Sequence, residues 1–324
     1  MAAGNSQVVI YAALAGNLAI ALTKFAAAWW TGSGAMLSEA LHSLVDTSNQ
    51  GFLLLGLRRS ARPASQRHPF GHGMEIFFWA FIVALTIFAL GGAASIYEGV
   101  QRLRDPEPIR DPWINFVVLA VSFAIEATSL RVAWRELRRS QPDRTMLAAL
   151  RGSKDPSVFS IFCEDFAALV GLSVAAVGLA LAYILNEPRF DAAASFAIGG
   201  ILILTAMFLA RETLSLMTGE SASAEVLTAV RAVLEGDPRV QRIEEILSMH
   251  LGPSDILLGI SLDFFDEMTS DEIETAVHEI GEKLGACQPS VRKVFVRPVQ
   301  RMRKSAAQER GLLTAQSTGK QMNE

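Results

Sequence analysis

Six long apolar stretches constrain this chain more than any other feature of its sequence. Each is long enough to cross the hydrocarbon core of a bilayer, which is roughly 30 Å thick and takes about 20 helical residues. Backbone polar groups in lipid need internal partners, so helices are the expected form of such segments. We therefore predict an all-α membrane bundle of six helices, which occupy residues 7–31, 34–58, 75–101, 112–136, 157–185 and 190–217.

The composition agrees with a membrane protein and argues against several other classes. Hydrophobic residues make up 51% of the chain and charged residues 19%, which is too apolar for an ordinary soluble protein of this length. The net charge of -4 argues against nucleic acid as a partner. Cys163 and Cys287 lie far apart and form no CxxC, so we expect neither a disulfide framework nor a thiolate zinc site.

The distribution of basic residues predicts the orientation of the bundle. Arginine and lysine are abundant in the link between the second and third apolar segments and in the link between the fourth and fifth. The positive-inside rule then places both termini in the cytoplasm, although the link between segments three and four also holds three arginines. The first apolar run lacks a basic leader and a clear cleavage site, so we expect it to be retained. The absence of a targeting segment and the Ala/Arg usage favour a bacterial inner membrane.

A small soluble domain is predicted after the last apolar segment. Helical patterns cover residues 224–234 and 269–283, and strand patterns cover 240–251, 256–264 and 291–296. The order helix, strand, strand, helix, strand fits a cytoplasmic α+β ferredoxin-like domain. We thus predict three regions, namely a transmembrane domain (1–219), a ferredoxin-like dimerisation domain (220–300) and a disordered polar tail (301–324).

The second apolar segment carries the most informative polar residues. His42 and Asp46 are four residues apart and therefore share one face of a helix, with Glu39 one turn before and Asn49 one turn after. Ionisable groups at membrane depth cost about 2.5–3.5 kcal/mol each on insertion scales, and so mark a functional site by default. Imidazole and carboxylate together suit a divalent metal such as zinc. A buried hydrogen-bonded pair that fixes helix packing is the alternative.

Other candidate ligands lie on three further apolar segments. Asp165 is a candidate metal ligand, and the adjacent Glu164 is either a ligand or a structural partner, because neighbouring residues on a helix point about 100° apart. Asn17 in the first segment has an amide oxygen that could complete a metal shell, but an interhelical hydrogen bond is the preferred interpretation. Glu126 in the fourth segment is either a relay carboxylate or a partner for a buried cation.

A pair of histidines precedes the third apolar segment. His68 and His72 lie in the sequence HPFGHG and could hold a second metal ion. The alternative is a turn whose glycines set the entry to the following helix. The second interpretation is preferred.

These motifs together resemble the cation diffusion facilitator family of metal/proton antiporters. The resemblance covers about residues 7–298 and is most specific in the second apolar segment. It rests on SGAMLSEALHSLVD at 33–46, HPFGHG at 68–73, Asp165 with Gly171, Asp191, and GES at 219–221. The stretch from Glu39 to Gln50, with Glu164 and Asp165, looks most like the branch that includes the mitochondrial zinc transporter of animals.

The resemblance implies a homodimer that exports divalent cations, zinc above all, in exchange for protons. The dimer would form through the cytoplasmic domain and the helices, with no permanently bound cofactor. In this family, helices two and five supply the metal site, which here implies His42, Asp46 and Asp165. The family's usual fourth ligand, a histidine, is replaced by Ile161, so Glu164, Asn17 or water would complete the shell.

Two rival functions remain open at this stage. The first is a carrier of the same architecture for manganese, iron or cobalt, because oxygen-rich shells favour harder ions. The second is a membrane scaffold or sensor that does not transport and whose soluble domain recruits a partner. An intramembrane hydrolase is the least favoured class, because the chain has no HExxH or GxSxG motif and no Ser/Lys pair.

Overall fold

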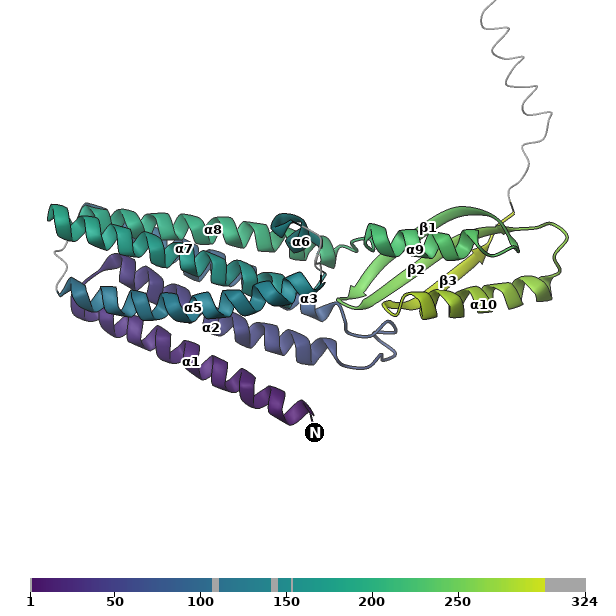
Figure 1. Cartoon of the computed structure of the whole chain (residues 1–324), viewed down its shortest axis with the longest axis horizontal. Helices are drawn as coiled ribbons and strands as arrows, with labels where there is room; N and C mark the ends of the chain where they lie inside the picture. The colour runs from purple at the N-terminus through teal and green to yellow at the C-terminus, as the bar shows by residue number, and fades with distance from the viewer. Residues whose placement is uncertain (1, 107–110, 141–144, 153, 301–324) are drawn as a thin grey trace, which may run out of the picture. The chain divides into compact units, whose positions relative to one another are not determined.

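The computed structural model describes residues 2–106, 111–140, 145–152 and 154–300 (Figure 1). It divides into two compact units, each with its own hydrophobic core. The first unit comprises Met1–Ser221 with Met249–Asp255, and the second comprises Ala222–Ser248 with Ile256–Glu324. The predicted disordered tail, 301–324, lies outside the described residues.

The first unit is helical, as the six apolar segments predict. Its helices are α1 (Ala2–Thr31), α2 (Gly34–Ser60), α3 (Glu75–Thr86), α4 (Ala94–Arg104), α5 (Pro112–Ser140), α6 (Met146–Gly152), α7 (Pro156–Leu185) and α8 (Arg189–Met217). A π-helical turn, η1 (Ile87–Ala93), joins α3 to α4, so the third predicted segment is one continuous rod with a local widening. The sequence patterns did not predict η1 or the short helix α6.

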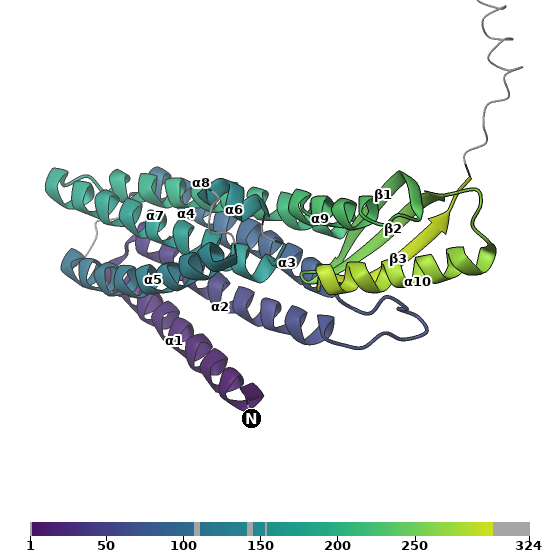
Figure 2. The ribbon, with the colours of Figure 1, turned by 45° about the vertical axis from the view of Figure 1, so that its right-hand side comes forward.

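Four of these rods, counted among the described residues, are long and apolar enough to span a membrane. They are Glu75–Arg104, Pro112–Arg135, Pro156–Leu185 and Arg189–Met217. Helix α2 has the required length, but Glu39, His42 and Asp46 interrupt its apolar character. In both views of the ribbon, the N-terminal end of α1 diverges from α2 (Figures 1 and 2).

Close backbone contact joins α4 and η1 to α8. A Cβ atom built at Gly199 of α8 would lie 2.8 Å from the carbonyl oxygen of Gly92, and one built at Gly99 would lie 2.7 Å from the amide nitrogen of Phe196. Small residues permit such contact between membrane helices. We call the contact of Gly92 and Gly99 with α8 the glycine seam.

The second unit has the predicted α+β architecture. Its elements are α9 (Ala224–Glu235), β1 (Val240–Gly252), β2 (Asp255–Phe264), α10 (Ser270–Cys287) and β3 (Val291–Pro298). The sheet order is β1-β2-β3, and β2 pairs with β3 in parallel. This is the ferredoxin-like arrangement expected from the sequence, with α10 ending four residues later than predicted.

Alternation along β2 and a cap on α10 account for this fold. Ile256, Leu258 and Ile260 are buried on one face of β2 and pack against the core of the unit, as a strand period of two requires. At the start of α10, the Thr269 hydroxyl accepts from the Glu272 amide, and the Glu272 carboxylate accepts from the Thr269 amide. This reciprocal capping box defines the beginning of the helix.

Candidate metal site

A small polar cavity lies among α1, α2, α5 and α7 in the first unit. Its volume is about 30 Å³, enough for one or two water molecules. It is lined by Asn17, Ile20, Ser43, Asp46, Gln50, Ile125, Glu126, Ser129, Ile161, Glu164 and Asp165. Five residues that the sequence marked as candidates, namely Asn17, Asp46, Glu126, Glu164 and Asp165, therefore meet at one place.

Helix α2 contributes the imidazole and one carboxylate. The His42 Nδ1 and the Asp46 Oδ1 are 3.5 Å apart, which is too long for a good hydrogen bond. The His42 ring is 1% exposed, and neither of its nitrogens has a hydrogen-bond partner among the described residues. Asp46 lines the cavity, whereas His42 is buried beside it. Buried imidazole nitrogens without partners are groups that a ligand could satisfy.

Helix α7 contributes two adjacent carboxylates. Asp165 and Glu164 both line the cavity, although neighbouring residues on a helix diverge. The Ser129 hydroxyl of α5 donates to Asp165 Oδ2 at 2.7 Å, which fixes that carboxylate. The Glu164 Oε1 is buried with no partner among the described residues. One turn earlier, Ile161 presents an apolar side chain to the same cavity.

The carboxylates line this cavity, but they do not converge on one common position. Within the described residues, no group of three or more His, Cys, Asp and Glu side chains is arranged to hold a metal ion. Coordination of an ion would therefore require these side chains to change conformation. Of the site residues predicted from the sequence, Asn17, Asp46, Glu164 and Asp165 thus line one cavity without forming a coordination shell, whereas His42, His68 and His72 do not line it.

The loop histidines lie apart from this cavity, in the link between α2 and α3. The His68 and His72 rings are 4.3 Å apart between centroids. The His72 Nδ1 lies 2.8 Å from Glu75 Oε1, and Glu75 Oε2 lies 3.7 Å from Arg59. Glu75 therefore already engages His72 at the start of α3.

The sequence analysis missed a buried lysine beside the cavity. Lys24 of α1 is 0% exposed, and its Nζ donates to Glu39 Oε2 at 3.2 Å and to Ser43 Oγ at 2.8 Å. The signal was present, because a lone charged residue within an apolar span is expensive in lipid. However, no oppositely charged residue lies one helical turn from Lys24 on α1, so no spacing pattern drew attention to it.

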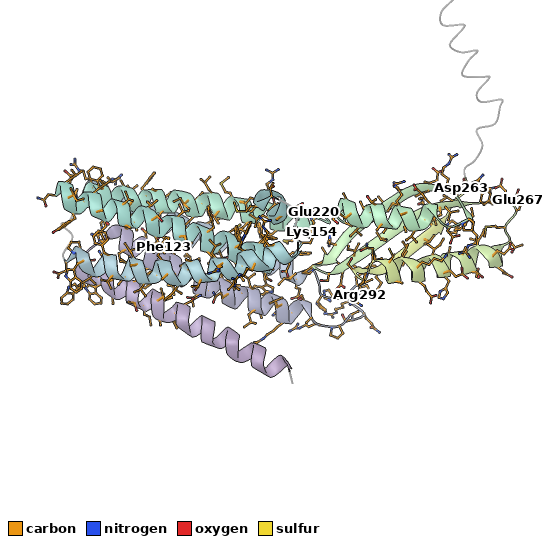
Figure 3. All side chains as sticks on the ribbon, viewed as in Figure 1. Phe123, Lys154, Glu220, Asp263, Glu267 and Arg292 are labelled. Carbon is orange, nitrogen blue, oxygen red and sulfur yellow. The ribbon has the colours of Figure 1, made fainter. Side chains whose placement is uncertain are left out.

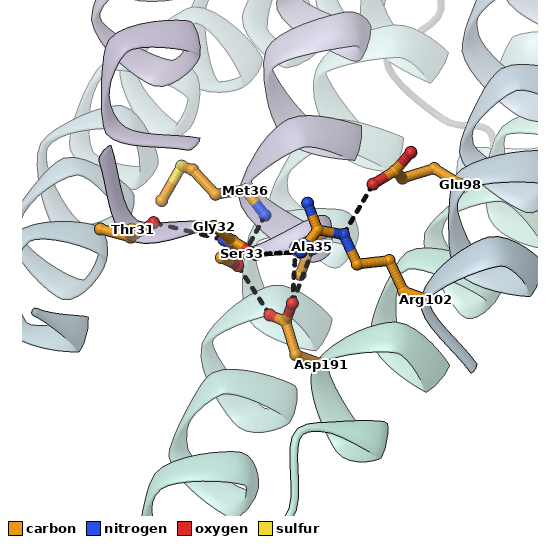
Figure 4. A network of polar contacts seen from close by, with 9 residues as sticks. Thr31, Gly32, Ser33, Ala35, Met36, Glu98, Arg102 and Asp191 are labelled. Atoms are coloured by element: carbon orange, nitrogen blue, oxygen red, sulfur yellow. Dashed lines mark hydrogen bonds and ion pairs between the residues drawn. The ribbon is translucent and has the colours of Figure 1, made fainter. Parts of the chain in front are cut away.

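A second polar network fixes the start of α2. The Asp191 carboxylate of α8 accepts from the Ser33 hydroxyl at 2.7 Å and from the Gly34 amide at 2.6 Å (Figure 4). It also accepts from the Ala35 amide at 3.3 Å, while Arg102 donates to the Gly32 carbonyl. A carboxylate at a helix N-terminus satisfies unpaired amides and complements the helix dipole. Asp191 thereby positions the helix that carries His42 and Asp46.

An ion pair ties two other ends of this unit together. Lys154, just before α7, pairs with Glu220, just after α8, and the two residues are labelled side by side in Figure 3. The pair joins the entry to α7 with the exit from α8 and so secures the ends of these packed helices.

Comparison with known proteins places this arrangement in context. The cation efflux transmembrane domain matches residues 10–218. The human mitochondrial proton-coupled zinc antiporter SLC30A9 is 32% identical over 285 residues, which cover 81% of this chain and 50% of that protein. Metal tolerance protein C4 of Arabidopsis thaliana is 30% identical and is matched over 82% of this chain and 58% of its own length.

Bacterial and structural relatives were also found. The cation-efflux pump FieF of Cronobacter sakazakii is 27% identical, over 76% of this chain and 79% of that protein. A nickel form of the MamM CTD covers 25% of this chain and 100% of its own, with 14% identity and a TM-score of 0.23. The chain spans about half the length of the mitochondrial antiporters that it matches.

Proposed function

The chain belongs to the cation efflux family, whose members are transporters and not enzymes, and from this premise we propose that it exchanges divalent cations for protons across a membrane. Zinc is the proposed main substrate, because the similar human protein is a zinc antiporter. The observation that carries the proposal is the polar cavity into which α2 brings Asp46 and α7 brings Glu164 and Asp165.

The proposed ligands are His42, Asp46 and Asp165, with Glu164 as the fourth. Metal binding requires a neutral imidazole and ionised carboxylates, so protons and metal compete for the same atoms. His42 suits such competition because an imidazole nitrogen binds either a proton or a metal ion, but not both at once. The Asp46 and Asp165 carboxylates alone offset the charge of a divalent ion, so the loaded site would be near neutral with Glu164 protonated, which lowers the cost of holding the ion in a low-dielectric bundle.

The transport cycle would expose this cavity to each side in turn. We place both termini in the cytoplasm from the loop arginines, and the protein in a bacterial inner membrane, which is supported by its similarity to FieF pumps. The active form would be a homodimer joined through the soluble unit and the helices. The orientation, the membrane and the homodimer are proposed for this chain on the basis of its family.

Zinc flux in proteoliposomes tests the proposal. With a pH gradient as the driving force, Asp46→Asn and Asp165→Asn should each lower zinc transport at least tenfold, because each removes a ligand charge. Asp271→Asn is a matched control at an exposed position at the start of α10 and should stay within twofold of the parent. Transport at the parent rate by both cavity variants would contradict the proposed site, and transport without dependence on the pH gradient would contradict proton exchange.

One observation favours a second substrate class. No imidazole or thiolate lines the cavity among the described residues, and Ile161 occupies the position expected to carry a histidine. Oxygen ligands suit harder ions, so manganese, iron or cobalt would be favoured over zinc. A transport panel at equal ion concentrations separates these, with Ile161→His expected to shift the preference toward zinc. A manganese rate above the zinc rate in the parent would favour the second candidate.

A further inference from the structure

Lys24, the buried lysine of α1, lies beside the cavity and has no role in the transport mechanism proposed so far. Lys24 and Glu39 are both 0% exposed, and their charged atoms are 3.2 Å apart. The second hydrogen bond of the lysine goes to Ser43, whose side chain lines the cavity. The Ser43 hydroxyl therefore links the ammonium group to the cavity wall.

The Glu39 carboxylate is only half satisfied. Its Oε2 accepts from Lys24, whereas its Oε1 is buried and has no hydrogen-bond partner in the part of the chain that the structure describes. That free oxygen faces α7, where a Cβ atom at Gly171 would lie 2.6 Å from it. The glycine thus leaves room for a carboxylate between the two helices that carry the proposed ligands.

Spacing places this carboxylate on the ligand face of α2. Glu39 precedes His42 by three residues and Asp46 by seven, so all three lie along one side of the helix. The Lys24 ammonium group lies on this side as well, because it contacts Glu39 and Ser43, the residue that follows His42. A divalent ion in the cavity would therefore lie near the positive charge of Lys24. The Glu39 carboxylate would already be paired with that charge.

We propose that Lys24 is a tethered cation that occupies the Glu39 carboxylate in the metal-free carrier and competes with the transported ion. The proposal rests on the proposed function and deepens it. An ion that enters the cavity is repelled by the ammonium group, and the ion pair keeps Glu39 from contributing to its binding. Lys24 is thus a positioning residue, which weakens binding and so aids release of the ion.

The test measures zinc affinity of the full-length protein in detergent, at constant pH, by titration calorimetry. Lys24→Met removes the charge but keeps most of the side-chain volume, and should tighten the Kd at least tenfold, equivalent to about 1.4 kcal/mol. Zinc transport by the same variant should fall because release is slowed. Glu39→Gln leaves the lysine without its counter-ion and should weaken zinc binding at least tenfold.

Two further variants keep the test decisive. Lys24→Gln retains hydrogen bonding to Glu39 and Ser43 without the charge, and so replaces Lys24→Met if that variant does not fold. It should also bind zinc at least tenfold more tightly. Lys293→Met is the matched control, because it makes the same chemical change at an exposed position on β3.

A purely structural ion pair predicts a different pattern. Removal of either partner would then lower the unfolding temperature, but the zinc Kd of the folded protein would stay within twofold of the parent. That result, or weaker binding by folded Lys24→Met or Lys24→Gln, would overturn the inference while leaving the proposed function intact. Failure of the parent itself to bind zinc would overturn the proposed function, and the tethered cation with it.

Discussion

Replacement of Asp191 by alanine should destabilise the first unit more than removal of any single helix cap on its surface would. The carboxylate is 3% exposed and accepts from the Ser33 hydroxyl and from the Gly34 and Ala35 amides. Asp191→Ala leaves these three donors unpaired at about 1–1.5 kcal/mol each, which gives a loss of about 3–4.5 kcal/mol. Asp191→Asn keeps one accepting oxygen but turns an amide group toward a donor, so it should cost about 1–3 kcal/mol.

Thermal unfolding of the detergent-solubilised protein, followed by tryptophan fluorescence, measures this effect. Ser33→Ala is the graded control, because it removes one hydrogen bond to Asp191 and the cap on the Met36 amide, a loss of about 1 kcal/mol. The expected order of unfolding temperatures is parent, Ser33→Ala, Asp191→Asn, Asp191→Ala. If Asp191→Ala unfolded at the parent temperature, the α8 carboxylate would not hold the start of α2, and the reasoning would be refuted.

Two further perturbations follow from the packing and from the charges of the soluble unit. Gly171→Ala should destabilise the protein by about 1–3 kcal/mol, because its methyl group would meet the Glu39 carboxylate, whereas Gly281→Ala has open space in α10 and should stabilise by about 0.5–1 kcal/mol. Thermal unfolding measures both, and equal shifts would contradict the packing argument. Hydrogen bonds from Arg239, above all, hold the pKa of Asp237 well below its usual range. A lowered carboxyl pKa adds stability that is present above about pH 4 and is lost as the pH falls toward the folded-state pKa. Asp237→Asn should therefore lower the unfolding temperature at pH 7 and flatten its dependence on pH below 4, and an unchanged pH profile would be inconsistent with this role.

Local patterns were sufficient to predict most of the architecture. Apolar length predicted the membrane helices, and alternation with turn residues predicted the three strands of the soluble unit, because both signals depend on nearby residues. The π-helical turn η1 was not predictable in this way. It lies where Gly91 and Gly92 meet α8, and this contact depends on a partner more than 100 residues away.

The sequence marked several residues that the structure brings to one cavity, but it did not indicate how they are arranged. Cost in lipid marked Asp46, Glu164 and Asp165, and they do line one cavity. The partners of these groups come from other helices, so the sequence could not indicate that Lys24 neutralises Glu39. Tertiary pairing of single residues on separate helices leaves no spacing pattern in the chain.

The glycine seam has a mechanical consequence for any carrier cycle. A Cβ atom added at Gly99 would collide with the α8 backbone, and one added at Gly92 would collide with Ile203 of α8, so there is little slack for sliding at this contact. We therefore expect α4 and α8 to move together as one rigid body. Reorientation of the cavity from one face of the bilayer to the other would then be accommodated by the helices packed around α4 and α8. Those helices carry Lys24 and most of the buried acidic residues.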